Sequence, residues 1–107
     1  MLLNDGVFAG RRILSKEAIR SFQKNHFPTA LSSWASLAGY GYSNLMRVLV
    51  DPRMAQIPVA PGEYGWDGWS GPYFAIDPKE KTILLAMTGT LGYDPTEDRR
   101  RIKRALY

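Results

Sequence analysis

The first stretch of the chain with a regular apolar pattern covers residues 16–25. Ile19 and Phe22 fall on one face at helical spacing, and charged side chains occupy most of the other positions. Ser15 stands directly before this stretch, where its hydroxyl can cap a helix N-terminus. The pattern predicts a helix over residues 16–25 that packs on a sheet through Ile19 and Phe22.

A second helical pattern covers residues 95–106. Asp94 is placed to cap this helix, and Pro95 stands at its first position, where the missing N–H of proline costs nothing. Ile102 and Leu106 form a narrow apolar stripe, so we expect the helix to pack on the sheet through them.

The apolar residues between the two helices predict four short strands. Their expected ranges are residues 44–50, 63–69, 72–77 and 81–88. The last two are joined by a turn that begins with Asp77 and Pro78, residues that a type I turn favours at its first two positions. Because the last strand is apolar on both faces, we expect both faces to be covered.

These elements predict an α+β fold with a single domain over residues 1–107. The sheet is mainly antiparallel, a three-stranded meander follows a preceding strand, and the N- and C-terminal helices pack on it. We expect residues 26–38 to be irregular and the proline-rich residues 53–63 to form a loop.

The composition removes several classes of site. The chain has no cysteine, which excludes disulfides, thiolate zinc sites and thiol catalysis. His26 is the only histidine, so a metal site or a catalytic triad has at most one imidazole available. We therefore expect no metal and no cofactor.

The sequence carries no targeting or membrane pattern. The opening residues MLLNDG lack the charged and apolar regions of a signal peptide, and no apolar run is long enough to cross a bilayer. We expect a soluble chain and assign no compartment to it.

The formal net charge of +4 is concentrated near the C-terminus. From Thr96 onward five basic residues stand against Glu97 and Asp98, so this segment alone supplies +3 of the +4. We interpret these charges as a solvated helix face and expect no nucleic-acid partner. A phosphate-binding face is the alternative, and a steep fall of affinity with salt would reveal it.

The most unusual composition lies in residues 62–78, which read GEYGWDGWSGPYFAIDP. Five aromatic side chains alternate here with four glycines, and Trp66 and Trp69 are two of the three tryptophans in the chain. Large aromatics between glycines either pack within a sheet or line a hollow that a ligand enters.

Several segments follow one another in an order found in a known family. MLLNDGVFAGRRILSKEAI comes first, then GYGY before a strand, then YGWDGWSGPYFAIDPKEKTILLAMT and a closing helix. This order resembles the C-terminal part of the serine β-lactamase-like superfamily, the group of class C β-lactamases, DD-peptidases and family VIII esterases. The resemblance covers nearly the whole chain, is strongest over residues 64–88, and implies a partial β-lactamase-like α/β domain.

The resemblance implies a substrate-binding wall. In this family Ser-x-x-Lys supplies the nucleophile and its base, Tyr-x-Asn assists proton transfer, and a Lys/His-Thr-Gly strand forms one wall of the site. Trp66, Asp67 and Gly68 stand at this third motif and are the candidate substrate-binding residues. Gly68 would keep the wall flat, and the backbone amide of Trp69 would donate to the oxyanion. Trp66 replaces the usual Lys or His, as in esterase-like members, which weakens the case for recognition of a β-lactam carboxylate.

Two short patterns imitate the other motifs. Ser21 to Lys24 reads SFQK and Tyr42 to Asn44 reads YSN, only 21 positions further on, whereas the family separates these motifs by a large helical region. We interpret both as non-catalytic and expect no catalytic nucleophile in this chain. Glu63 and Asp67 could pair as acid and base, although their spacing does not require it.

The sequence therefore predicts the C-terminal part of a serine hydrolase acting on an ester, amide or peptidoglycan-related acyl substrate. It would be inactive alone, and Met1 would be either an internal residue of a longer protein or the start of a truncated gene. Its expected partner is a missing N-terminal half or a second copy of itself. The alternative is a small, non-catalytic interaction module that binds a protein or oligomerises.

Overall fold

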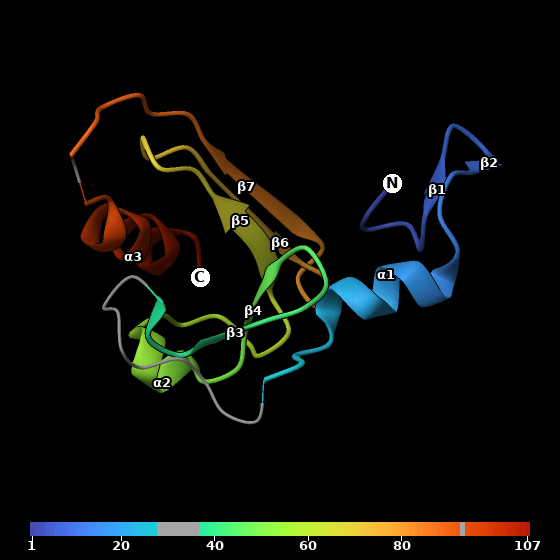
Figure 1. The fold of residues 1–107 in the computed structure, drawn as a ribbon, viewed down its shortest axis with the longest axis horizontal. Helices are drawn as coiled ribbons and strands as arrows, with labels where there is room; N and C mark the ends of the chain where they lie inside the picture. The colour runs from blue at the N-terminus through green and yellow to red at the C-terminus, as the bar shows by residue number, and fades with distance from the viewer. Residues whose placement is uncertain (28–36, 93) are drawn as a thin grey trace.

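The computed structural model describes residues 1–27, 37–92 and 94–107. In this part of the chain, helices lie on both sides of a five-stranded sheet, with α3 and α1 on opposite sides (Figure 1). The strands are β1 (Val7–Phe8), β2 (Arg11–Arg12), β3 (Tyr40–Tyr42), β4 (Arg47–Leu49), β5 (Tyr64–Asp67), β6 (Tyr73–Asp77) and β7 (Thr82–Ala86). The helices are α1 (Lys16–Gln23), α2 (Pro52–Ala55) and α3 (Thr96–Leu106).

The five-stranded sheet has the order β3-β4-β5-β6-β7, and every pairing in it is antiparallel. The predicted α+β class and the meander of β5, β6 and β7 are thus confirmed. The predicted strand over residues 44–50 is shorter, and β3 joins it as a hairpin partner, with Tyr40 opposite Leu49. β5 is therefore central, because this chain supplies a strand on each of its two sides.

Helix α1 forms as its sequence predicts. The Ser15 hydroxyl accepts a hydrogen bond from the Ala18 amide at 3.1 Å, and Ile19 is buried. Phe22 packs against a buried cluster of the sheet that contains Val48 and Tyr64. This cluster forms the core on the α1 face of the sheet.

The predicted loop over residues 53–63 is wrong at its start. Asp51 Oδ1 accepts hydrogen bonds from the Arg53 and Met54 amides and caps the short helix α2, whose first residue is Pro52. The helix places Ala55 in a second buried cluster, whose other members are Tyr40, Leu49, Ile57 and Val59. The irregular region expected over residues 26–38 falls mostly on residues 28–36, outside the described part.

Helix α3 packs through a different face from the predicted one. Ile102 and Leu106 are exposed, whereas Lys103 is buried against the sheet. The reason is electrostatic, because the carboxylates of Asp67 in β5 and of Glu63 just before it bind basic side chains of α3. The expectation of a solvated basic face is accordingly wrong for Arg99, Arg100 and Lys103.

The expectation that β7 is covered on both faces is also wrong in this chain. Ile83, Leu85 and Met87, called here the β7 strip, are 58%, 65% and 76% exposed. The residues between them are partly buried on the face that carries α3. β7 is moreover the last strand of the sheet, so one of its edges has no partner strand among the described residues (Figure 1).

Candidate functional site

An open pocket of about 500 Å³ lies beside the C-terminal end of β5. It is lined by the three residues predicted for the binding wall, Trp66, Asp67 and Gly68, and by Trp69, the candidate oxyanion donor. The other lining residues come from the β3 region, from the approach to α3 and from α3 itself: Leu37, Tyr42, Gly92, Asp94, Pro95 and Arg99.

The pocket exists because two neighbouring strands leave β5 at different points. β4 pairs with β5 at Tyr64 and Gly65, whereas β6 stays paired with it as far as Asp67. Beyond Gly65, the edge of β5 that faces β4 therefore opens into the pocket. An extended group could lie along such an edge and use its backbone groups for hydrogen bonds.

Gly68 permits the tight connection from β5 to β6. Its amide donates to the Pro72 carbonyl at 2.8 Å, and a Cβ atom on Gly68 would lie 2.8 Å from Pro72 Cγ. A larger residue here would push the turn and the adjoining wall apart.

The two tryptophans differ in their surroundings. Trp69 is 93% exposed, so its side chain does not pack within the sheet. Trp66 is 43% exposed, and its ring meets that of Tyr42 edge-on, with the centroids 5.5 Å apart. Phe27 also meets the Tyr42 ring edge-on, with the centroids 6.0 Å apart. Together these rings form an aromatic flank beside β5.

Asp67 is held by two arginines. Its Oδ1 atom lies 3.0 Å from Arg47 Nη1, and its Oδ2 atom lies 2.9 Å from Arg99 Nη1. Both oxygens are thus bound to guanidinium groups, and the carboxylate ties the end of β5 to α3. The backbone of Asp67, rather than its carboxylate, is the part that a ligand in the pocket can meet without breaking an ion pair.

The two arginines were missed by the sequence analysis. Arg47 stands in a strand, 20 positions before Asp67, and Arg99 stands 32 positions after it. Neither spacing leaves a local pattern. The one usable signal is a lone arginine inside an otherwise apolar strand, because a buried charge requires a partner.

Glu63 does not line the pocket. Its carboxylate binds Lys103 Nζ, and both side chains are buried between α3 and the sheet. Burial lowers the pKa of Lys103 to about 8, against the opposing attraction of Glu63. Glu63 thus binds Lys103 and Asp67 binds two arginines, and the acid–base pair considered from the sequence is not assembled in the pocket.

The residues that imitate the catalytic motifs are separated. The Ser21 hydroxyl donates to the Ala18 carbonyl of its own helix at 2.7 Å, and Lys24 is exposed. Tyr42 does reach the pocket, but burial, and secondarily the charge of Asp67, raise its pKa. A raised pKa keeps the phenol protonated and opposes a role as general base.

Two further classes of site were searched for in the described part of the chain. No group of three or more potential metal-ligating side chains gathers there. Within the same residues, no helix has the length and apolarity needed to cross a bilayer.

The chain matches no family model. It is 32% identical over 96 residues to the uncharacterized protein MT1414 and to the protein Rv1367c, from two strains of Mycobacterium tuberculosis. Each match covers 79% of this chain and 23% of the relative.

Among solved structures, it superposes on EstCE1, a hydrolase with promiscuous acyltransferase activity, with a TM-score of 0.76 and 23% identity. This superposition covers 98% of the chain and 26% of EstCE1. The chain has the fold of one segment of this hydrolase. It spans about a quarter of the length of each of these proteins.

Proposed function

We propose that the chain is the C-terminal part of a β-lactamase-like serine hydrolase that acts on an ester, amide or peptidoglycan-related acyl substrate. The observation that carries this proposal is the superposition of 98% of the chain on about a quarter of EstCE1. The motif order read from the sequence and the pocket at the third-motif position support it independently.

In this proposal Trp66, Asp67 and Gly68 form the wall along which the acyl substrate lies, and the Trp69 amide donates to the oxyanion. The Gly68 amide is already used, because it donates to the Pro72 carbonyl, and Trp69 follows it in the turn beside the pocket. One such donor contributes roughly a hundredfold or more to the rate of acyl transfer when the rest of the site is present.

The nucleophile and its base belong to the part of the hydrolase outside this chain. In the chain itself the Ser21 and Ser43 hydroxyls donate to backbone carbonyls, and neither residue lines the pocket. Without a placed nucleophile, the wall and one oxyanion donor supply too little of the rate to be seen.

The test is hydrolysis of nitrocefin and p-nitrophenyl esters by the isolated chain. We expect no turnover above background for the native chain, for Ser21→Ala or for Ser43→Ala. A burst of product that disappears in either serine variant would contradict the assignment of the nucleophile to another part of the protein.

The proposed partner is the missing N-terminal part or, in its absence, a second copy of the chain. The exposed β7 strip and the free edge of β7 support this proposal, because soluble proteins usually bury or pair such surfaces. The same surface favours the second candidate function, a non-catalytic interaction module. Purification of the chain with and without its upstream segment separates the two, since an independent module would not require that segment.

A further inference from the structure

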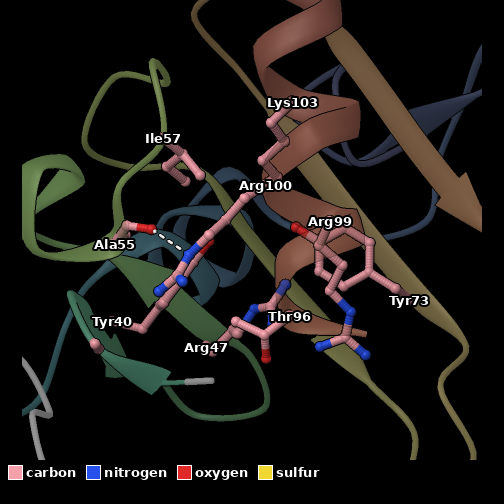
Figure 2. Close-up of a pocket in the computed structure, with 10 residues that line it drawn as sticks. Tyr40, Arg47, Ala55, Ile57, Tyr73, Thr96, Arg99, Arg100 and Lys103 are labelled. Atoms are coloured by element: carbon pink, nitrogen blue, oxygen red, sulfur yellow. Dashed lines mark hydrogen bonds between the residues drawn. The ribbon is translucent and has the colours of Figure 1, made fainter. Parts of the chain in front are cut away.

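A small cavity of about 20 Å³ lies between α3 and the sheet (Figure 2). It differs from the pocket at the end of β5, although Arg99 lines both. Four cationic side chains contribute to its wall: Arg47, Arg99, Arg100 and Lys103. Its remaining wall is formed by neutral residues, among them Tyr40 and Tyr73.

Arg47 is the central residue of this cavity. Its guanidinium carbon lies 4.7 Å from the ring centroid of Tyr40 and 4.5 Å from that of Tyr73, so the group is held between two aromatic rings. The side chain is only 2% exposed. Its Nη1 atom binds Asp67, but Nε and Nη2 are buried and have no hydrogen-bond partner among the described residues.

A second guanidinium adds another donor of this kind. Arg99 Nε is also buried without a partner among the described residues, while Arg99 Nη1 binds Asp67. Buried polar groups in folded proteins are almost always hydrogen-bonded, and an unpaired charged donor is especially costly. These donors therefore point to a ligand that accepts several hydrogen bonds.

The balance of charge favours an anion over water. No carboxylate is among the residues that line the cavity, although Glu63, Asp67 and Glu97 bind its cations from outside it. The four cations thus exceed these three carboxylates by one charge. A water molecule offers two lone pairs, fewer than the four N–H groups carried by the three unpaired nitrogen atoms, and it neutralises no charge.

We propose that this cavity binds a small monatomic anion, for which chloride is the physiological candidate and bromide the probe. The ion accepts hydrogen bonds from the guanidinium groups of Arg47 and Arg99 and offsets the positive charge buried under α3. The cavity volume of about 20 Å³ excludes large organic anions. Binding stabilises the docking of α3 on the sheet, and this role is independent of the proposed acyl-transfer function.

The first test compares thermal unfolding in sodium chloride and in sodium gluconate at equal ionic strength. Because an ion that binds only the folded state stabilises it, chloride is expected to raise the melting temperature by roughly 4–8 °C when it exceeds its dissociation constant several-fold. The rise should persist in Arg104→Lys, a basic residue of α3 that does not line the cavity, and disappear in Arg47→Lys. Equal melting temperatures in the two salts would overturn the proposal.

The second test needs no variant and decides the matter if Arg47→Lys fails to fold. Crystals of the native chain grown in sodium bromide should show an anomalous peak within hydrogen-bond distance of Arg47 Nε or Nη2. A water molecule at this position, with no bromide, would overturn the proposal. A bromide peak without chloride-dependent stability would mean an adventitious ion only, and would overturn it as well.

Discussion

The buried ion pair between Lys103 and Glu63 should make stability sensitive to the loss of either partner alone. Lys103→Met keeps most of the side-chain volume but leaves the Glu63 carboxylate buried without its cation. Breaking one partner of a buried pair costs about 3–5 kcal/mol, a large share of the total expected for a domain of this size. Urea denaturation should therefore show a strongly lowered free energy of unfolding.

A neighbouring basic residue of α3, Arg104, provides the control for this loss. Arg104 stands one residue further along α3 and is about half exposed, so Arg104→Met should cost less than about 1 kcal/mol. The double variant Glu63→Gln with Lys103→Met removes both charges and should recover part of the loss. Equal destabilisation by the two methionine variants would show that the buried pair does not act as described.

Gly65 is required by the closeness of two backbones. A Cβ atom at this position would lie 2.1 Å from the Phe74 carbonyl oxygen and 2.9 Å from the Ala75 Cα atom, so the β5–β6 pairing would have to open. Gly65→Ala should lower the free energy of unfolding by roughly 1–3 kcal/mol or more in urea denaturation. Gly89→Ala is the control, because its Cβ would meet nothing within 4 Å. Similar stability of the two variants would contradict this description of the sheet.

At the scale of single residues, a local motif identified neighbours that line one pocket, but it did not identify the ion pairs beside them. Trp66 to Trp69 were identified from a local motif, and all of them lie in one pocket. The clamp on Asp67 could not be predicted, because Arg47 and Arg99 approach it from distant parts of the chain. Long-range ion pairs leave no periodic signal, whereas a glycine-rich strand end does.

At the scale of elements, capping residues located the helix starts to within one residue, whereas the apolar stripe held for α1 and failed for α3. Ser15 caps α1 as predicted, and Asp94 Oδ1 accepts from the Thr96 amide at 2.9 Å, although α3 begins one residue later than expected. The stripe of Ile102 and Leu106 failed because the sheet offers carboxylates to the neighbouring positions Arg99 and Lys103, which turns these residues inward. Local hydrogen bonds depend on neighbours in sequence, but the buried face of a helix depends on what lies across from it.

The docking of α3 should depend on Asp67. Asp67→Asn removes the carboxylate that binds both Arg47 and Arg99. The buried guanidinium group of Arg47 and the largely buried one of Arg99 then lack their counter-charge. Because hydrogen bonds to charged groups contribute about 1.5–3 kcal/mol, amide hydrogen exchange in α3 should accelerate by about tenfold or more. Glu97→Gln alters an exposed partner of two other α3 arginines and should leave that exchange nearly unchanged. Unchanged protection of α3 in Asp67→Asn would contradict the proposed anchor.

At the scale of the whole molecule, the exposure of β7 could not be predicted from the chain alone. Its sequence has the two-sided apolar pattern of a covered strand, yet the β7 strip is open in this chain. The apolar pattern and the exposed strip agree if residues outside this chain cover the strip. The proteins that the chain matches are long enough to supply such residues, because the chain spans only about a quarter of their length. Burial of an edge strand is thus a property of the assembly that contains it.

The isolated chain should therefore self-associate through the β7 strip. The register sets Trp66 opposite Phe74 and Phe74 opposite Leu85, so the exposed strip and Trp66 are joined through the partly buried Phe74 across three strands. Covering a few hundred Å² of this surface at about 25 cal/mol per Å² contributes several kcal/mol, enough to favour dimers or larger oligomers at micromolar concentration. Analytical ultracentrifugation should show such species for the native chain.

The same measurement on two matched variants locates the interface. Leu85→Lys places a charge in the middle of the β7 strip and should shift the chain toward monomer without unfolding it, because the side chain is already exposed. Leu106→Lys introduces the same charge at an exposed leucine of α3 and should leave the association unchanged. A native chain that sediments as a monomer and unfolds in one sharp transition would show that the strip needs no cover. An interface lost in Leu106→Lys instead would move the contact to α3, and either result would contradict self-association through the β7 strip.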